Sequence, residues 1–244
     1  MKEKPLEAGA GLVWERPEPP GRTAPGPLSR DGIVRAAMAI ADAEGLVSVS
    51  LRKVAAALDA GPMRLYGYVA TKEELLDLMV DAVYGEMVSA GPIRGEWREA
   101  LRSTAHRIRG AAGAHKWFIE LVAVGRPNMG PHTLAFLEAS LAALSDAPGF
   151  KDIDTILHAV RTVSVYAIGA IQSEARDLRV ERESGMDEAQ WQESFWPYLQ
   201  RVIATGRFPM IARVVRDAIH PKPEAMFDQG LDCVLDGIAA RLSR

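Results

Sequence analysis

Four basic side chains lie within one short stretch of the chain. Between residues 50 and 72 the bases are Arg52, Lys53, Arg64 and Lys72, and Asp59 is the single acidic residue. A guanidinium or ammonium group can bind a phosphate, and an arginine can also make two hydrogen bonds to the edge of a guanine base. Residues 73–86 carry five acidic residues and no base. The charge pattern therefore indicates a contact with nucleic acid that is confined to residues 50–72.

Two short helices are predicted to carry these bases. Ser50 can cap a helix that presents Leu51, Val54, Ala55 and Leu58 on one face. Asp-Ala-Gly at residues 59–61 breaks the pattern, and Pro62 suits the first position of the next helix, which we expect to end near residues 69–70. Two short helices joined by a glycine-containing turn are typical of a helix-turn-helix, whose second helix enters the DNA major groove.

A longer helix is predicted on each side of this pair. Ser29 can cap a helix that runs to Gly45. Thr71 and Glu74 have the spacing of a capping box, in which the Thr71 side chain accepts from the Glu74 N–H and Glu74 reaches back to residue 71. The helix after this box is expected to bury Leu75, Leu76, Met79, Val80, Val83 and Met87.

The run from Leu51 to Val83, LRKVAAALDAGPMRLYGYVATKEELLDLMVDAV, closely resembles the DNA-binding domain of TetR-family transcriptional regulators. The residues that carry the resemblance are Leu65-Tyr66, Tyr68-Val69 and Lys72-Glu73-Glu74. The similarity covers about residues 29–87. It implies a homodimer whose two helix-turn-helix domains read a palindromic DNA operator. It also implies a larger helical domain whose small-molecule effector lowers the affinity for DNA.

The expected DNA contacts follow from residue types and from this resemblance. Arg64 lies in the reading helix and can contact guanine, whereas Lys72 can share a phosphate with the free N–H groups that begin the next helix. Pro62 and Met63 can touch a thymine methyl group. The full set is Arg52, Lys53, Pro62, Met63, Arg64, Tyr66, Tyr68 and Lys72. The alternatives are solvated charges for the basic residues and helix initiation or packing for the others.

The remainder of the chain also has helical patterning, so the predicted fold class is all-α. Breakers such as Pro148-Gly149, the Arg179–Gly185 run and Gly206 separate the segments. The expected helices are Glu96–Ala112, Lys116–Val124, Pro131–Ser145, Ile153–Leu178, Glu188–Ala204, Met210–Ala218 and Glu224–Leu242. We divide the chain into a disordered tail (1–28), a helix-turn-helix DNA-binding domain (29–88) and a helical effector-binding and dimerisation domain (89–244).

The larger domain more weakly resembles the ligand-binding domain of tetracycline repressors. Gly125-Arg126-Pro127, the glycine-containing helix Val163–Arg176 and the last helix carry this resemblance. Val122 stands where those repressors use a polar group, so tetracycline is not the expected effector. Aromatic residues and isolated polar groups suggest a mostly apolar ligand. The candidates are Thr104, Trp117, Arg126, His132, Phe136, Tyr166 and Gln172, and packing or structural hydrogen bonding is the alternative for each.

Two helices of the larger domain are expected to form the dimer. The last one has an apolar stripe of Phe227, Leu231, Val234, Ile238 and Leu242, with Gly230 and Gly237 seven residues apart on one face. The long helix has a comparable stripe of Ile153, Leu157, Val160, Ser164, Ala167 and Ile171. Two such helices from each subunit would make a four-helix bundle.

Composition excludes several classes of protein. The chain has 244 residues, 48 % of them hydrophobic, and a net charge of −3, which does not suit a wholly basic nucleic-acid binder. Its single cysteine, Cys233, excludes an intrachain disulfide framework and fits a reducing, cytoplasmic setting. Neither a signal peptide nor a membrane span is expected. Prolines and balanced charges in residues 1–28 predict a mobile tail, with a partner-contacting arm as the alternative.

No enzyme motif emerges from the inventory of residues. The histidines do not form His-Glu-x-x-His, and the sequence has no Gly-x-Ser-x-Gly, P-loop or GxGxxG. We therefore expect no catalytic site, no cofactor and no metal. The favoured function is a ligand-responsive repressor. The alternatives are an activator or effector-independent regulator, an all-α enzyme or carrier with a vestigial helix-turn-helix, and a helical scaffold that binds only protein.

Overall fold

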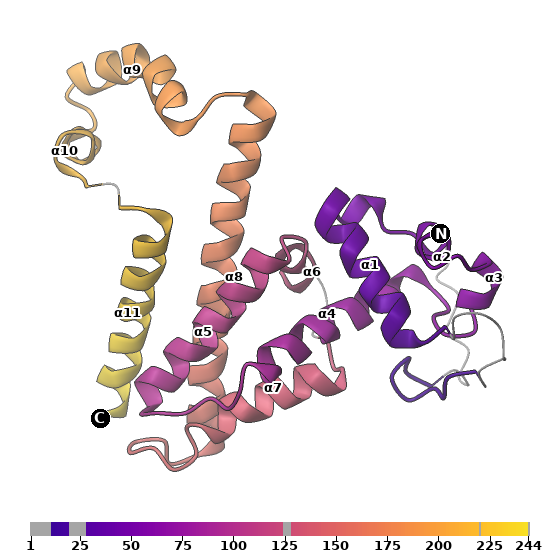
Figure 1. Ribbon diagram of the computed structural model, residues 1–244. Coiled ribbons are helices and arrows are strands. Elements are labelled where there is room, and N and C mark those ends of the chain that lie inside the picture. Colours follow the sequence, from indigo (N-terminus) through magenta and orange to yellow (C-terminus); the bar gives the residue numbers. More distant parts are fainter. Residues whose placement is uncertain (1–10, 20–27, 124–127, 220, 244) are drawn as a thin grey trace, which may run out of the picture.

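A computed structural model describes residues 11–19, 28–123, 128–219 and 221–243. This part of the chain is helical throughout and contains no strand, as predicted for an all-α protein. Figure 1 shows two bodies joined by one helix: a small N-terminal group of helices, and a larger group built along the long helix α8 (Ile153–Ser184).

The N-terminal body begins as the capping residues predict. Its elements are α1 (Arg30–Glu44), the short 3₁₀ helix η1 (Leu46–Ser48), α2 (Leu51–Ala57), α3 (Pro62–Leu65) and the start of α4 (Lys72–Ser89). The Ser29 and Ser50 side chains accept hydrogen bonds from Gly32 and Lys53 N–H, at 3.1 and 3.2 Å. Gly45 ends α1 with a φ of 84°. Helix α3 ends at Leu65, earlier than expected, and residues 66–68 form a turn.

A dense apolar core holds these short helices together. Side chains from α1, α2, α3 and α4 meet in it, and those with 0 % exposure include Ile33, Ala37, Val54, Leu65, Val69 and Leu75. Short helices are marginal alone, because few hydrogen bonds repay the cost of starting a turn. Their positions are therefore set by tertiary packing, and the reading helix depends on its neighbours.

The larger body packs helices around α8. Its elements are α5 (Trp97–Ala114), α6 (Phe118–Val122), α7 (Pro131–Ala142), α8 and α11 (Pro223–Leu242), and α4 packs along α7. Helix α5 lies against α8, and α11 covers a second side of α8. Helix α4 therefore belongs to both bodies, because it packs on α1 and also on α5, α6 and α7.

Helix α8 continues past the point where we expected it to break. The residues after Leu178 read RVERES and remain helical to Ser184. Arginine, glutamate and valine carry no strong penalty in a helix. The first real stop is Gly185, which adopts a left-handed φ of 67° and donates its N–H to the Glu181 carbonyl at 3.0 Å.

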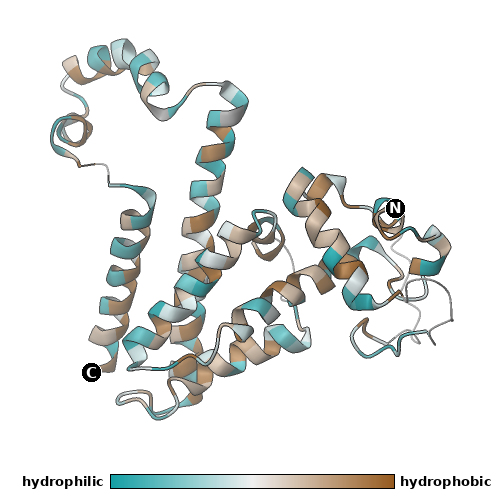
Figure 2. Cartoon of the chain, viewed as in Figure 1, coloured by the Kyte–Doolittle hydropathy of each residue, from teal (hydrophilic) through white to brown (hydrophobic). Residues whose placement is uncertain are grey.

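Two helices stand away from the main body. Helices α9 (Glu188–Ala204) and α10 (Pro209–Asp217) follow α8 and pack chiefly against each other, forming an arm beside the upper end of α8 (Figure 1). Figure 2 shows apolar residues along this arm as well as along the main body. The exposed apolar side chains of the arm are Trp191, Phe195, Trp196, Tyr198, Phe208, Met210, Ile211 and Val214.

The apolar stripe that we assigned to a dimer interface packs inside one chain. Phe227, Leu231 and Ile238 of α11 are buried, and the Phe227 ring contacts Tyr166 of α8 and His106 of α5. Gly230 admits the Tyr166 side chain, since a Cβ there would lie 2.2 Å from the hydroxyl. For these three residues the prediction of a dimer face is wrong, because helices of the same subunit cover them, whereas Val234 and Leu242 are only half-buried.

The matching stripe on α8 is likewise divided. Val160, Ala167 and Ile171 are buried within the chain, whereas Ile153 and Leu157 are exposed. Only the exposed part remains available to another molecule.

Residues 11–19 do not form the unstructured tail that the composition predicts. Residues 12–16 make a helical turn, in which the N–H groups of Glu15 and Arg16 donate to the Leu12 carbonyl at 2.9 and 3.2 Å. Val13 is only 4 % exposed, and Arg16 forms an ion pair with Glu74 of α4. The prediction is wrong here because the segment finds partners on the folded body. Residues 1–10 and 20–27 lie outside the described residues.

None of the helices in the described ranges combines the length and the apolar character that crossing a bilayer requires.

Candidate nucleic-acid interface and ligand cavity

Helix α3 and the turn after it have one buried side and one exposed side. Leu65 is fully buried, whereas Met63 and Tyr66 are 80 % and 49 % exposed. Pro62, Arg64 and Gly67 are also exposed. A surface that holds an arginine, a methionine and a tyrosine on a short helix fits the width of a major groove. Five of the predicted DNA contacts, Arg52, Pro62, Met63, Arg64 and Tyr66, are thus on the surface of the helix-turn-helix.

The other predicted DNA contacts are more enclosed. Tyr68 is 7 % exposed and belongs to the core of the N-terminal body. Lys53 forms an ion pair with Glu44 at the end of α1. Lys72 is half-buried at the first position of α4, where free N–H groups begin the helix. Tyr68 therefore supports the reading helix from behind, and Lys53 offers its charge to DNA only if it leaves Glu44.

The cap of α4 differs in one hydrogen bond from the predicted box. The Thr71 hydroxyl accepts from the Glu74 N–H at 3.1 Å, as expected. Glu74, however, accepts a 2.7 Å hydrogen bond from the N–H of Ala70 instead of the N–H of Thr71. The prediction of a reciprocal box is wrong because the Glu74 carboxylate lies between Ala70 and Arg16.

Acidic residues cover the side of α4 beyond this cap. Glu73 and Asp77 are exposed there. Partial burial and the nearby charges of Glu74 and Glu73 raise the pKa of Asp77 above its usual range. A crowded acidic face repels phosphate, so the candidate interface ends at Lys72.

Two of the predicted ligand-binding residues make hydrogen bonds inside the fold. The Trp117 side chain is 2 % exposed and donates its indole N–H to Asp42 of α1 at 2.6 Å. Thr104 is buried in α5, and its hydroxyl donates to the Ala100 carbonyl at 3.0 Å. Trp117 therefore joins the two bodies, and Thr104 is satisfied within its own helix.

His132 and Phe136 both belong to the contact between α7 and α4. The His132 ring nitrogen Nδ1 lies 2.9 Å from the buried carboxylate of Asp81. Phe136 is buried and its ring packs against Tyr84, with centroids 5.6 Å apart. Burial raises the pKa of the Tyr84 hydroxyl.

The last three predicted ligand residues lie apart from these. The Tyr166 hydroxyl donates to the Phe227 carbonyl at 2.7 Å, which ties α8 to α11. Gln172 is half-buried on α8, and Arg126 lies outside the described residues. None of the six described candidates lines the cavity described next.

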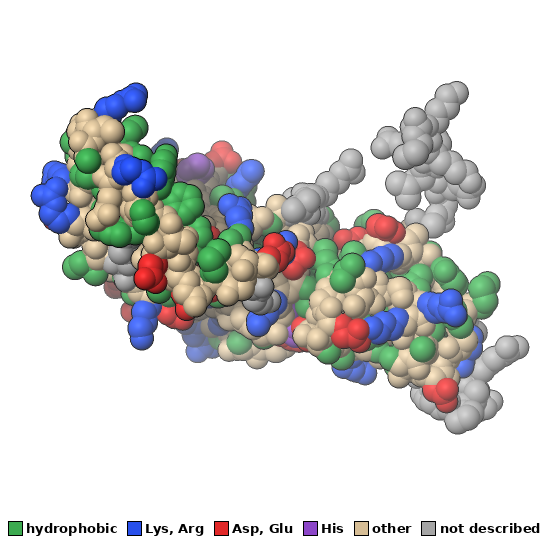
Figure 3. Space-filling model, turned by 90° about the horizontal axis from the view of Figure 1, so that it is seen from above, with side chains coloured by type: hydrophobic (Ala, Val, Ile, Leu, Met, Phe, Trp, Pro, Cys, Tyr) green, Lys and Arg blue, Asp and Glu red, His purple; other side chains and the backbone are tan. Residues whose placement is uncertain are grey.

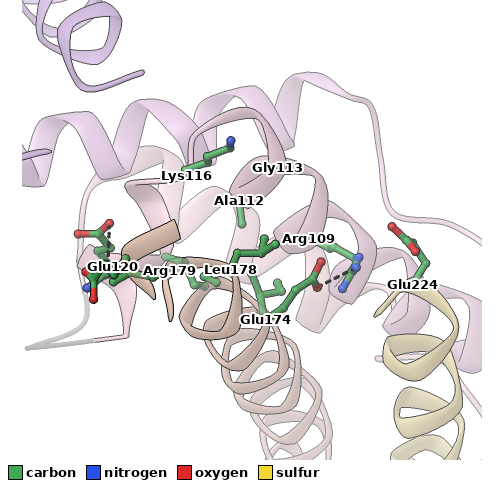
Figure 4. Close-up of a pocket in the computed structure, with 13 residues that line it drawn as sticks. Arg109, Ala112, Gly113, Lys116, Glu120, Glu174, Leu178, Arg179 and Glu224 are labelled. Atoms are coloured by element: carbon green, nitrogen blue, oxygen red, sulfur yellow. Dashed lines mark hydrogen bonds and ion pairs between the residues drawn. The ribbon is translucent and has the colours of Figure 1, made fainter. Parts of the chain in front are cut away.

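A cavity of about 630 Å³ opens instead between α5, α6 and the upper part of α8 (Figure 4). Its apolar lining includes Ala112, Ile119, Ile171, Ala175 and Leu178. Charged side chains surround this lining, and they are Arg109, Lys116, Glu120, Glu174, Arg179, Glu183 and Glu224. The volume suits a small organic molecule, and the lining offers both apolar area and groups that fix orientation.

Arg109 is held at the edge of this cavity. Its guanidinium lies 2.9 Å from the Glu174 carboxylate and stacks over the Phe227 ring, 4.6 Å from the centroid. On the opposite side of the cavity, Arg179 lies 3.5 Å from Glu120 (Figure 4). Arg109 and Arg179 therefore each have an acidic neighbour on a different helix, so a ligand would meet paired charges there.

Sequence reasoning missed these lining residues for a physical reason. Charges spaced along α5 and α8 match the pattern of a solvated helix face. The four-residue spacings of Lys116 with Glu120 and of Arg179 with Glu183 are local signals, and such spacings are common on ordinary surfaces. The cavity depends on the crossing of α5 over α8, which no local pattern specifies.

An exposed helix-turn-helix, a separate helical body with a cavity and one helix shared by both define a ligand-binding DNA regulator. The family model for the tetracyclin repressor-like C-terminal domain matches residues 91–242. The chain therefore belongs to the tetracycline-repressor family of transcriptional regulators, which are not enzymes.

Two curated regulators are similar over almost the whole chain. The HTH-type transcriptional repressor DrrR1 of Streptomyces coeruleorubidus is 35 % identical over 228 residues, which covers 93 % of this chain and 83 % of the relative. An HTH-type transcriptional regulator of Saccharopolyspora erythraea is also 35 % identical, over 98 % of this chain and 96 % of its own.

A solved structure has the same architecture. Apo ActR of Streptomyces coelicolor aligns with a TM-score of 0.75 and 25 % identity, covering 90 % of this chain and 99 % of ActR. ActR in complex with actinorhodin aligns with a TM-score of 0.74 and 26 % identity, over 88 % of this chain and 97 % of ActR.

Proposed function

We propose that the chain is a homodimeric repressor that leaves a palindromic operator when a small molecule enters the cavity between α5, α6 and α8. Residues 29–88 read DNA, and residues 89–244 bind the effector and form the dimer. The observation that carries the proposal is that α4 packs on both bodies. A ligand that moves α4 in one subunit changes the spacing of the two reading heads.

The exposed side of the helix-turn-helix supports DNA reading. Arg64 is exposed on α3, and its guanidinium forms no ion pair with any of the described residues, whereas Lys72 begins α4. We assign Arg64 to a base edge and Lys72 to a phosphate. Arg52, Pro62, Met63 and Tyr66 surround them. Tyr68 and Lys53 support the interface from behind in this proposal.

The cavity supports a ligand with an apolar body and a few polar groups. Its apolar floor provides area for burial, and the paired charges of Arg109 and Arg179 provide orientation. We place the effector here instead of at Thr104, Trp117, His132, Phe136, Tyr166 and Gln172, whose side chains are spread over several contacts. DrrR1 is named a repressor, which is a precedent for repression of transcription. ActR was solved with actinorhodin, which is a precedent for a small-molecule effector.

Exposed apolar surface supports a homodimer through the C-terminal helices. Leu157 and Val165 of α8 and Met226 of α11 face outward. The arm of α9 and α10 adds tryptophan and phenylalanine side chains, and Figure 3 shows apolar side chains along it with basic side chains at its edge. Patches of this kind mark interfaces. We propose that a second copy of the chain covers them, and that the dimer works in the cytoplasm.

Fluorescence anisotropy tests the proposal. The wild-type protein first selects a duplex from a random pool, and its affinity is then measured over a salt series. We expect two chains per duplex and an affinity that falls steeply with salt, because lysine and arginine displace counterions from phosphates. A protein that selects no duplex, or that binds without any salt dependence, would overturn the proposal. Actinorhodin, the ligand of a solved relative, is the first compound to test for release.

A further inference from the structure

Residues 11–19 touch the beginning of α1. The carbonyl of Arg16 accepts a hydrogen bond from the Arg30 guanidinium at 2.9 Å, and the Glu18 carboxylate accepts one from the Arg30 N–H at 3.3 Å. Arg30 is the first residue of α1. The first N–H groups of a helix lack partners within the helix, and a carboxylate is favoured beside them. The backbone N–H and the guanidinium of Arg30 therefore hold the segment on the folded body.

The same segment reaches the beginning of α4. The Arg16 guanidinium forms an ion pair with Glu74, and both side chains are about three-quarters buried, with exposures of 27 % and 25 %. The same Glu74 oxygen accepts the N–H of Ala70 at 2.7 Å. Ala70 lies in the link between the turn after α3 and Lys72. A chain of contacts thus runs from Arg16 through Glu74 to the backbone between the two predicted DNA-contacting elements.

The end of the segment lies against the turn after the reading helix. A Cβ built on Gly67 would come within 3.1 Å of the Pro19 side chain. Gly67 follows α3 directly, so the absence of a side chain there permits this close approach. In Figure 1 the segment is the indigo strip below α1 and α3. At the other end of the segment, Val13 is buried and anchors it.

We propose that residues 11–19 brace the reading helix, and that Arg16 is a positioning residue for DNA recognition. The inference rests on the DNA binding proposed above. Helix α3 has only four residues, and a helix this short does not hold its own position. A paired contact between an arginine and a base tolerates an error of roughly 0.5 Å. The brace fixes the backbone that follows that helix, at Gly67 and Ala70, without touching DNA itself.

Four variants of the full-length chain test the brace. Arg16→Ala removes the ion pair, Arg16→Lys keeps the charge, and Val13→Ser removes the buried anchor. Arg35→Ala is the matched control, since Arg35 is an exposed arginine on α1 that takes no part in these contacts. Each variant is measured against the duplex that the wild type selects and against a shuffled duplex of equal composition, and its thermal unfolding is recorded.

A positioning role predicts a selective loss. Arg16→Ala and Val13→Ser should weaken the selected duplex by roughly tenfold, as for the loss of one charge-assisted hydrogen bond, and leave the shuffled duplex as in Arg35→Ala. Arg16→Lys should recover most of the affinity. Equal losses of affinity on both duplexes would overturn the brace, and so would an Arg16→Ala variant that matches Arg35→Ala on both. Neither outcome would contradict the proposal that the protein binds DNA. A wild type that selects no duplex would overturn both.

Discussion

The indole N–H of Trp117 donates a 2.6 Å hydrogen bond to the carboxylate of Asp42, which joins the start of α6 to the end of α1. His115 completes this contact, because its two ring nitrogens lie 2.9 Å from Asp42 and 3.0 Å from Glu86 of α4. The cluster ties the reading domain to the junction of α5 and α6, two of the helices that border the cavity. Its strength therefore bears on how far a ligand can move the reading head.

The His115 contacts should make stability depend on pH. Burial alone would lower the pKa of His115, but the hydrogen bonds and charges of Asp42 and Glu86 raise it above its usual value. A group with a raised folded-state pKa stabilises fully below its unfolded pKa, and this contribution is lost as pH rises through the folded pKa.

Urea unfolding between about pH 6 and about pH 9 checks this dependence. The difference in unfolding free energy between wild type and His115→Gln should be largest at the acid end and should shrink as the pH rises. His158→Gln, at an exposed position of α8, should show no such trend. A difference that stays constant with pH would contradict the assigned role of the charged ring.

Asp81 should be important for the packing of α4 on α7. Its buried carboxylate accepts the N–H of Thr133 at 2.8 Å and its hydroxyl at 3.0 Å, and it lies 2.9 Å from the ring of His132. Asp81→Ala leaves these donors unpaired, and we expect a loss of about 3 kcal/mol in unfolding free energy. Asp77→Ala is the control one turn away, because that exposed carboxylate is crowded by like charges. Chemical denaturation that finds equal effects for both variants would disprove the anchor.

Arg64 and Lys72 should differ in the kind of loss that they cause. Arg64→Ala should relax base preference at one position per half-site, because a paired contact to guanine contributes about 1–3 kcal/mol of discrimination. Lys72→Ala should weaken all sequences alike and reduce the salt slope by about one unit per half-site. Anisotropy with a set of singly substituted duplexes separates the two. Uniform losses for both variants would show that Arg64 contacts only phosphate.

The exposed face of α8 should hold the dimer together. Val165 is 62 % exposed at the middle of this helix. Val165→Asp places a charge where a second subunit would bury it, and we expect monomers at concentrations where the wild type is dimeric. Val47→Asp is the control, since that valine is 91 % exposed on the N-terminal body. Sedimentation equilibrium decides, and a dimeric Val165→Asp protein would place the interface elsewhere.

Local chemistry predicted the helices well, because their ends depend on neighbouring residues. Ser29, Ser50, Pro62 and Thr71 begin helices as expected, since each acts within three residues of its own position. Contacts between distant residues were beyond such reasoning. No pattern connects Arg16 to Glu74.

The cavity and the dimer stripe illustrate the same limit. The lining residues Arg109 and Glu174 are far apart in sequence and resemble ordinary surface charges. The stripe on α11 was recognised as buried, but periodicity does not say whether the same chain or a second one covers it. The sequence around Val165 does not indicate that this side chain is exposed on α8.

A ligand in the cavity should release the protein from DNA. A compound that quenches tryptophan fluorescence is titrated into the complex of protein and labelled selected duplex, while anisotropy is recorded. Ala175 lines the cavity, so Ala175→Phe should fill part of it and leave DNA affinity unchanged. Ala142→Phe, at an exposed position of α7, is the matched control.

We expect the compound to release the duplex from wild type and from Ala142→Phe, and to leave it bound to Ala175→Phe. Quenching compounds that never release the duplex, or release from Ala175→Phe at the wild-type concentration, would contradict the account.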